Sequence, residues 1–255
     1  MEFYKYHGTG NDFIIIDNRN GEVVLTADDV ADLCNRRFGI GADGLMLLEQ
    51  AEGYDFRMVY YNSDGNESTM CGNGGRCIVA FAREKGLIST KANFLAIDGA
   101  HAATIEDDGL VSLHMQDVTE IKLHEDHAVL NTGSPHYVRW VDDVVHTDVY
   151  GEGHSIRNLP VYQPKGINVN FVQALDGNRL LVRTYERGVE DETLSCGTGV
   201  TASAIAATGD TTGIFLTDIE TPGGVLTVSF TKHDPLSATG IVLTGPAVLV
   251  FTGNI

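Results

Sequence analysis

The alternation of apolar and polar residues along the chain predicts a protein built mainly of β-strands. Short runs rich in β-branched and aromatic residues are bounded by Gly, Asn, Asp or Ser. These runs predict strands at 12–17, 45–49, 56–61, 111–115, 137–141, 168–173, 180–185, 225–230 and 241–243. Helical signals are fewer. Thr26 followed by Asp29 predicts an N-cap for a helix over 27–37.

Two further predicted helices begin directly after cysteines. One covers 72–85 after Cys71, and the other covers 197–208 after Cys196. The second consists almost entirely of small or apolar residues and has no charged face. A helix of that kind is expected to be surrounded by protein.

These two cysteines lie in an internal repeat. The segments 67–73 and 192–198 match, with their cysteines 125 residues apart, and the same spacing relates Tyr60 to Tyr185. Each segment leads into one of the only two Cys-Gly-x-Gly sequences of the chain, at 71–74 and 196–199. We therefore interpret the chain as one plan used twice. Each half is expected to be a mostly β shell around a short buried helix, with the boundary near 116–120, before a polar loop through residue 127.

Composition restricts the classes of partner. The formal net charge is −18 and the isoelectric point is near 4.7, which argues against nucleic acid or an anionic membrane as a partner. The N-terminus shows no signal-peptide pattern, and no apolar run is long enough to span a bilayer. Four cysteines in a chain of 255 residues do not form a disulfide framework, so a reducing cytoplasm is expected.

A cysteine immediately before a helix has two chemical consequences. The unpaired N–H groups and the dipole of the first turn stabilise a thiolate and so lower the pKa of the thiol. The same N–H groups bind an anion such as a carboxylate, and glycine lets the backbone approach it closely. Glycine is abundant here, at 29 residues, and several of these surround Cys71 and Cys196.

Two such elements related by a repeat suit inversion of a carbon next to a carboxylate. One thiolate would remove the Cα proton while the opposite thiol delivers a proton to the other face. The helix N-termini would stabilise the developing enediolate. Cys34 and Cys77, by contrast, are expected to be buried apolar residues.

Several motifs spread over the whole chain resemble the diaminopimelate epimerase family. They lie at 7–13, 39–44, 70–77, 135–136, 186–188 and 195–199. The resemblance implies an α+β fold of two pseudo-symmetric domains, each a mostly antiparallel, barrel-like β-shell around a central helix. It places the domains at 1–116 and 117–245, with a C-terminal strand over 246–255 packing on the first. It also implies a cofactor-independent and metal-free cytoplasmic enzyme, a homodimer, that interconverts LL- and meso-diaminopimelate.

The resemblance also assigns roles to individual residues. Cys71 and Cys196 match the family's two acid/base cysteines, and His136 and Glu186 match the residues that assist them. The residues expected to bind the substrate are Asn11, Asn62, Gly72, Asn73, Asn168, Glu186, Arg187, Gly197 and Thr198. A guanidinium such as that of Arg187 suits the distal carboxylate as a bidentate donor.

Three features depart from the family pattern. Ser134 stands where the family commonly has Asn, and Gly44 stands where some members have Gln. The segment 187–193 is one residue longer than in many members. These differences bear on substrate contacts more than on the reaction.

Specific features of the sequence argue against three other functional assignments. Residues 39–44 satisfy G-x-G-x-x-G, but a predicted helix precedes them and a predicted strand follows, which inverts the order of a dinucleotide site. The polar stretch 124–127 lacks further metal-ligand spacing, and no lysine accompanies either cysteine motif as a pyridoxal-phosphate racemase would require. A proline racemase or hydroxyproline epimerase, and a non-catalytic amino-acid-binding relative, remain as alternatives.

Overall fold

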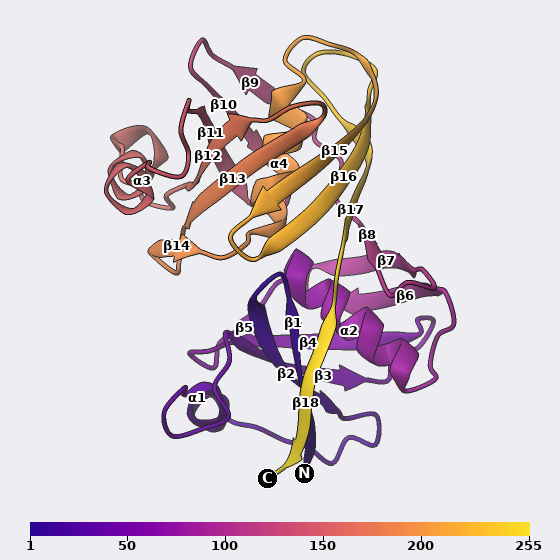
Figure 1. Ribbon diagram of the computed structural model, residues 1–255. Coiled ribbons are helices and arrows are strands. Elements are labelled where there is room, and N and C mark those ends of the chain that lie inside the picture. The colour runs from indigo at the N-terminus through magenta and orange to yellow at the C-terminus, as the bar shows by residue number, and fades with distance from the viewer. The chain divides into compact units, whose positions relative to one another are not determined.

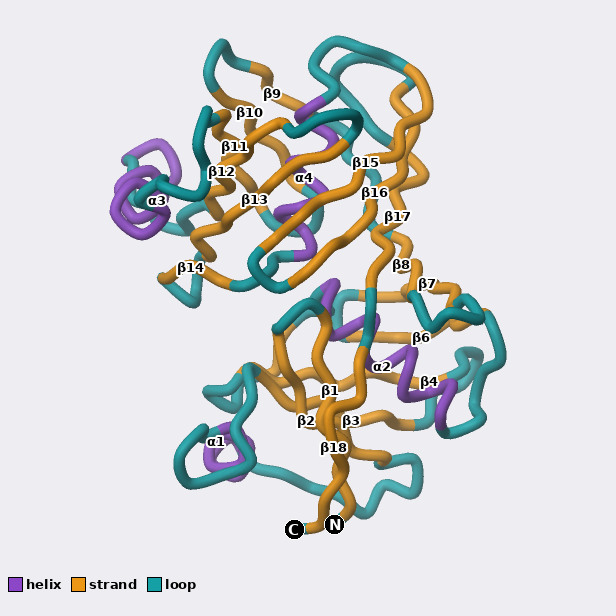
Figure 2. Tube along the Cα trace, in the orientation of Figure 1, coloured by secondary structure: helices purple, strands orange, loops and turns teal.

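The computed structural model describes all 255 residues, and the chain divides into two compact units. Unit 1 comprises Met1–Leu113 and Gly245–Ile255, and unit 2 comprises His114–Thr244. Strands dominate both units and helices are few, which confirms the predicted α+β class (Figures 1 and 2). No helix is long and apolar enough to cross a membrane.

The elements of unit 1 come from both ends of the chain. They are β1 (Glu2–Gly8), β2 (Asn11–Asp17), α1 (Ala27–Cys34), β3 (Gly44–Glu49), β4 (Phe56–Asn62), β5 (Glu67–Ser68), α2 (Gly72–Glu84), β6 (Lys91–Ala96), β7 (Gly99–Ile105), β8 (Val111–His114) and β18 (Val248–Asn254).

Unit 2 is continuous in sequence. Its elements are β9 (Ile121–Leu123), β10 (His127–Asn131), β11 (Pro135–Trp140), α3 (Val149–Arg157), the 3-10 helix η1 (Pro160–Tyr162), β12 (Asn168–Ala174), β13 (Arg179–Glu186), β14 (Asp191–Thr193), α4 (Gly197–Ala207), β15 (Gly213–Thr221), β16 (Gly224–Lys232) and β17 (Thr239–Gly245).

The two units share one strand order. Strands pair successively as β1, β2, β3, β4, β6, β7 and β8 in unit 1, and as β10, β11, β12, β13, β15, β16 and β17 in unit 2. The pairs β2–β3 and β4–β6 are parallel, as are their counterparts β11–β12 and β13–β15, and the others are antiparallel. The duplication expected from the cysteine motifs is therefore present in the topology.

The last strand of each repeat pairs with the first strand of the other. β9 follows β8 along the chain but pairs with β10, and β18 follows β17 but pairs with β1. In Figure 1 the yellow strand β18 accordingly lies beside the indigo strand β1, with both chain termini together. The backbone N–H of Ile255 donates to the carbonyl oxygen of Met1 at 2.9 Å, which joins the two ends.

Helix α4 is enclosed by the strands of unit 2, as its composition predicted. Nine of its eleven residues are buried, and its apolar side chains pack against strands β11, β12, β13 and β16. Glycine, alanine and serine at seven of its eleven positions let the surrounding strands approach the helix closely. Burial of the apolar side chains on both sides contributes about 25 cal/mol for each Å² removed from water.

Several elements differ from the sequence prediction. Helix α1 ends at Cys34 rather than at 37, because the side chain of Asn35 accepts hydrogen bonds from the N–H groups of Arg37 and Phe38 and competes with the helix. The stretch through residue 127, predicted as a polar loop, contains β9. Helix α3 and strands β1, β6, β7, β10 and β15 were not predicted, whereas the C-terminal strand expected over 246–255 is β18, which pairs with β1.

Candidate active site

Cys71 is the N-cap of helix α2. Its backbone is extended, and the N–H of Gly74 in the first helical turn donates to its Sγ at 3.2 Å. The sulfur thus occupies the position in which a Ser or Asp side chain usually caps a helix. This geometry agrees with the expectation that the N-terminus of the helix supports a thiolate.

Two asparagines predicted to bind substrate lie together at this helix start. Asn73 is buried, and its Nδ2 donates to Oδ1 of Asn11 at 3.3 Å. Nδ2 of Asn11 in turn donates to the carboxylate of Asp43 at 2.7 Å. Asn62 ends β4 and pairs in register with Gly44, the residue after Asp43. Unit 1 therefore brings Asn11, Gly72 and Asn73 together, with Asn62 at the end of a nearby strand.

The sequence analysis missed Arg76, which is fully buried in unit 1. Its guanidinium donates to the carbonyl oxygens of Gly72 and Pro246, to Oδ1 of Asn73 at 2.9 Å and to the hydroxyl of Thr9. Burial lowers the pKa of Arg76 to about 10, so it remains a cation at neutral pH. Its bond to Oδ1 of Asn73 fixes which end of that amide faces Asn11.

Cys196 is the N-cap of helix α4 and is buried. Its Sγ lies 3.5 Å from Oγ1 of Thr198, and that hydroxyl lies 2.9 Å from Nε2 of His136. Burial, together with the positive charge of Arg187, lowers the pKa of His136 to about 3. The imidazole is therefore neutral at physiological pH.

The predicted ligands of the distal amino-acid end converge on Ser134. Nδ2 of Asn168 donates to Oγ of Ser134 at 2.8 Å, and Nη2 of Arg187 lies 3.3 Å from the same oxygen. The backbone N–H of Arg187 donates to Oδ1 of Asn168 at 2.8 Å. Ser134, identified from the sequence as a departure from the family pattern, thus holds two predicted substrate-binding side chains.

Glu186 is the last residue of β13 and directly precedes Arg187. Its Oε2 accepts a hydrogen bond from Oγ1 of Thr193 in β14 at 3.0 Å. Unit 2 therefore collects Cys196, Gly197 and Thr198 at one helix start, and places Glu186 and Arg187 at the end of a neighbouring strand.

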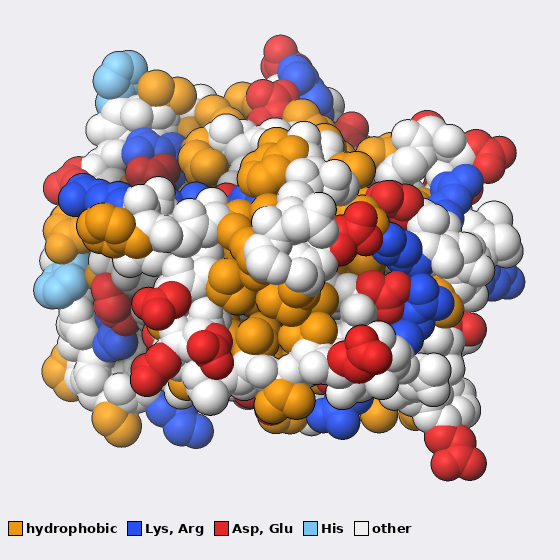
Figure 3. All heavy atoms as spheres, turned by 90° about the horizontal axis from the view of Figure 1, so that it is seen from below, with side chains coloured by type: hydrophobic (Ala, Val, Ile, Leu, Met, Phe, Trp, Pro, Cys, Tyr) orange, Lys and Arg blue, Asp and Glu red, His pale blue; other side chains and the backbone are white.

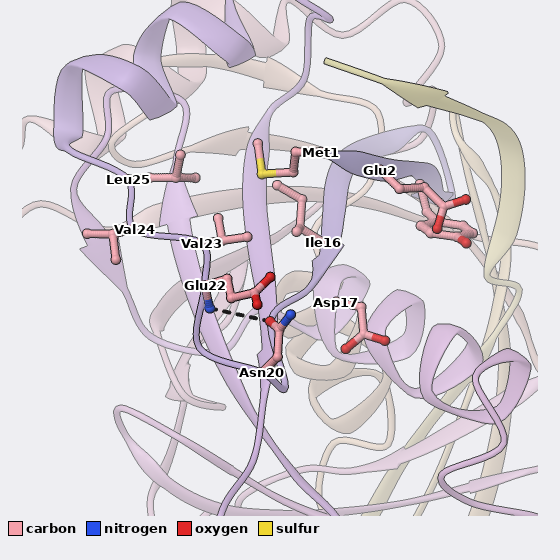
Figure 4. A pocket seen from close by; sticks show the side chains of 10 residues that line it. Met1, Glu2, Ile16, Asp17, Asn20, Glu22, Val23, Val24 and Leu25 are labelled. Atoms are coloured by element: carbon pink, nitrogen blue, oxygen red, sulfur yellow. Dashed lines mark hydrogen bonds between the residues drawn. The ribbon is translucent and has the colours of Figure 1, made fainter.

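Two surface hollows of unit 1 contain none of these residues. One, of about 500 Å³, is lined by residues of the chain start and of the segment 20–25 (Figure 4). The other, of about 680 Å³, is lined by apolar residues that include Met1, Phe38 and Ile255. The predicted site residues therefore lie at the helix starts and neighbouring strand ends, outside these two hollows.

The motifs set aside in the sequence analysis have structural positions of their own. Residues 39–44 connect helix α1 to strand β3, so a helix precedes them and a strand follows, as predicted. His124 and His127 flank the turn between β9 and β10, where the ring of His127 stacks on Tyr137 at 4.3 Å. Asp43 of the first segment is linked to the start of α2 through Asn11.

The fold defines a class that includes racemases and epimerases. A phenazine biosynthesis protein of the PhzF family from Bacillus anthracis superposes with a TM-score of 0.75 at 17% identity, covering 100% of this chain and 98% of that one. A probable proline racemase from Agrobacterium radiobacter gives a TM-score of 0.67 at 16% identity, covering 100% and 92%. At such identities the likeness concerns the fold alone.

Sequence comparison narrows the class to one family. The diaminopimelate epimerase family model matches residues 3–121 and 128–250. Diaminopimelate epimerases from Flavobacterium psychrophilum and Chlorobaculum tepidum are 53% and 43% identical, covering 100% and 97% of this chain and 100% and 98% of theirs. The chain belongs to the diaminopimelate epimerase family.

Proposed function

We propose that this protein interconverts LL-2,6-diaminopimelate and meso-2,6-diaminopimelate without a cofactor, in the synthesis of lysine and peptidoglycan precursors. The observation that carries the proposal is the presence of a cysteine at the N-cap of the equivalent helix in each of two repeated units. Membership of the diaminopimelate epimerase family supports the choice of substrate.

The reaction consists of two proton transfers at one carbon. One cysteine, as the thiolate, takes the Cα proton: the C–H bond breaks and an S–H bond forms. The other cysteine, as the thiol, gives its proton to the opposite face of that carbon and becomes the thiolate. The product has the inverted configuration, and the two sulfurs have exchanged protonation states. His136 and Glu186 assist these cysteines.

The N–H groups at the starts of α2 and α4 stabilise the charge that develops during the reaction. Removal of the Cα proton places negative charge on the substrate carboxylate, which Gly72, Gly197 and Thr198 are proposed to contact. The two amino-acid ends of the substrate are held by the side chains of Asn11, Asn62, Asn73, Asn168, Glu186 and Arg187. Arg187 fits the distal carboxylate because its guanidinium can donate two parallel hydrogen bonds.

The proposed enzyme has two domains, residues 1–116 with the C-terminal strand 246–255, and residues 117–245. We place it in the cytoplasm, where its four cysteines stay reduced. Its net charge of −18 argues against nucleic acid or an anionic membrane as a partner.

A homodimer is the proposed assembly, and the surface of unit 1 supports it. The consecutive residues Val248, Leu249, Val250 and Phe251 of β18 are each between 39% and 55% exposed. Figure 3, viewed from the side on which the termini lie, also shows hydrophobic side chains gathered at the surface there. A second copy of the chain is the occupant that would cover them.

The proposed function is tested by supplying each pure isomer to the purified protein without cofactor and separating the products by chiral chromatography. Both isomers are expected to reach the same LL:meso mixture. L-proline and trans-4-hydroxy-L-proline, supplied in parallel, are expected to remain unchanged. Conversion of either one, with diaminopimelate untouched, would establish the alternative assignment instead.

A further inference from the structure

A buried asparagine, Asn170 on β12, contacts the ring of His136 behind Cys196. Its side chain is fully buried, and its Nδ2 lies 3.0 Å from Nδ1 of His136 and 3.2 Å from the carbonyl oxygen of Tyr137. Neither the family motifs nor the spacing of cysteines indicated this residue.

The orientation of the Asn170 amide is fixed at both ends. The carbonyl oxygen of Tyr137 can only accept a hydrogen bond, so the NH₂ group must be the end that faces it. At the other end, Oδ1 accepts a hydrogen bond from Oγ1 of Thr184 at 3.0 Å. Nδ1 of His136 therefore meets a donor and must itself be the acceptor.

The orientation of the Asn170 amide determines which atom donates in the next two hydrogen bonds, between His136 and Thr198 and between Thr198 and Cys196. A neutral imidazole that accepts at Nδ1 carries its proton on Nε2. That proton is donated to Oγ1 of Thr198 at 2.9 Å, because no other tautomer fits both neighbours. The hydroxyl proton of Thr198 is then left to donate to Sγ of Cys196 at 3.5 Å.

We propose that Asn170 is a positioning residue that fixes His136 as its Nε2–H tautomer and so directs the hydrogen-bond donors of His136 and Thr198 toward the sulfur of Cys196. A donated hydrogen bond stabilises the thiolate relative to the thiol. The claim that this aids catalysis rests on the proposed function, whereas the direction of the hydrogen bonds does not.

The equivalent place in unit 1 lacks this series of hydrogen bonds from Asn170 to Cys196, so the fold itself does not require the series. Met46 on β3 pairs with Tyr60, as Asn170 on β12 pairs with Thr184, so the strand registers make Tyr60 the counterpart of Thr184 and not of Tyr185 as the sequence spacing predicted. Met46 also faces the glycine of the first turn of α2, Gly74, as Asn170 faces Gly199 of α4. Met46 thus occupies in unit 1 the place that Asn170 occupies in unit 2. Only the helix that begins after Cys196 has this series of hydrogen-bonded polar side chains beside its first turn.

Asn170 lies so close to helix α4 that position 199 has no room for a side chain. A Cβ at that position would lie 2.3 Å from Oδ1 of Asn170, a distance no side chain could occupy. The ionisable groups on the strands packed around α4 at this end are His136 on β11 and Glu186 at the end of β13, followed by Arg187. Substitution of Asn170 leaves all three in place.

The tautomer is measured directly by ¹⁵N NMR of the histidine side chains in the full-length protein. The signals of His136 are identified by their loss in a His136→Gln variant. The expected result is an unprotonated Nδ1 and a protonated Nε2 between pH 5 and pH 8. A protonated Nδ1, whether in the other tautomer or in an imidazolium, would overturn the proposal. This measurement involves no turnover, so it is independent of whether diaminopimelate is the substrate.

The effect on Cys196 is measured by alkylation with iodoacetamide, with the modified peptide quantified by mass spectrometry. A Cys71→Ala background removes the other N-cap cysteine. Asn170→Leu, close in size but without a donor, is expected to slow labelling of Cys196 at pH 7 about tenfold and to raise the pH midpoint of labelling by about one unit. Thr201→Val, which removes a buried hydroxyl bonded only to the carbonyl of Gly197, is the matched control and is expected to label as the parent does.

Equal labelling in the Asn170→Leu variant and its parent would contradict the proposal. If Asn170→Leu does not fold, Asn170→Asp takes its place, because a carboxylate accepts from Nδ1 and is expected to move the proton of His136 to that nitrogen. An unchanged Nε2–H tautomer in the folded Asn170→Asp variant would also overturn the proposal.

Discussion

Cys71 and Cys196 have different surroundings although they take equivalent places in the two repeats. The sulfur of Cys71 accepts the N–H of Gly74, and the buried guanidinium of Arg76 donates to the carbonyl oxygen of Gly72, the next residue along the chain. The sulfur of Cys196 instead contacts the hydroxyl of Thr198. A two-base reaction needs one thiolate and one thiol at any moment, so unequal surroundings are compatible with the mechanism.

The buried His136 is expected to make the stability of unit 2 pH-dependent. Its folded pKa of about 3 lies below the ordinary 6.5, so the unfolded chain takes up a proton first as the pH falls. The free energy of unfolding is therefore highest above pH 6.5 and falls between pH 6.5 and pH 3, by at most about 1.4 kcal/mol per pH unit from this residue.

The measurement compares the wild type with a His136→Gln variant by urea unfolding at pH 7, 6, 5 and 4. The single tryptophan, Trp140, lies in unit 2 and reports its unfolding by fluorescence. The difference in unfolding free energy between the two proteins is expected to shrink with falling pH. A difference that stays constant would show that His136 is not held neutral.

Ser134 is expected to influence substrate binding more than the chemical step. Ser134→Ala removes the oxygen shared by Asn168 and Arg187. We expect KM for diaminopimelate to rise about ten- to a hundredfold with kcat nearly unchanged, because a neutral hydrogen bond from Asn168 and a charged one from Arg187 are lost, each worth about 1 kcal/mol or somewhat more. Ser155→Ala, in which the lost hydroxyl bonds only to the carbonyl of Gly151 on α3, is the control. A fall in kcat without a change in KM would contradict this role.

Among the elements, sequence patterns predicted the two helices that follow Cys71 and Cys196 better than the strands around them. Helices α2 and α4 begin at the predicted residues because glycines after a cysteine mark their first turns. Strand β1 was missed because both faces are buried, so it shows no alternation of apolar and polar residues. Asn170 and Arg76 were missed because their importance comes from contacts between elements, which no local pattern encodes.

Gly199→Ala is expected to destabilise unit 2 by about 1–3 kcal/mol, the usual cost of overpacking a core. The added methyl group would lie 2.3 Å from Oδ1 of Asn170 and 3.3 Å from Cβ of Cys196. Urea unfolding followed by Trp140 fluorescence measures the loss. Gly74→Ala, at the equivalent place in unit 1, is the control and should leave the Trp140 transition unchanged. If Gly199→Ala had the same free energy of unfolding as the wild type, helix α4 and strand β12 could move apart enough to admit the methyl group without destabilising unit 2, which would contradict this prediction.

For the molecule as a whole, duplication explains why the two units share one strand order and why each repeat ends in a strand that pairs with the other repeat. Each repeat ends in a strand, β9 or β18, that pairs with the first strand of the other repeat, so the boundary between repeats falls after β9 rather than near 116–120. The match of one family model to two segments agrees with this plan. The C-terminal strand thereby also presents its apolar residues on unit 1.

Val250→Lys is expected to shift the protein from dimer to monomer. Val250 is 55% exposed on β18, and a lysine in an interface core would bury a charge without a partner. Light scattering after size-exclusion chromatography gives the molar mass. Val145→Lys, at a similarly exposed valine of unit 2, is the control that should stay dimeric. A monomeric wild type, or a dimeric Val250→Lys variant, would exclude β18 as the interface.

The central claim is that Cys71 and Cys196 act on opposite faces of one Cα. Its most direct test is α-deuterium incorporation from D₂O, with each isomer supplied separately and the label located by mass spectrometry and NMR. The wild type is expected to place solvent deuterium at the inverted centre of the product from either isomer, whereas Cys71→Ala and Cys196→Ala lose epimerisation by several orders of magnitude. Full turnover in either cysteine variant, or inversion in the wild type without deuterium uptake, would contradict the two-base mechanism.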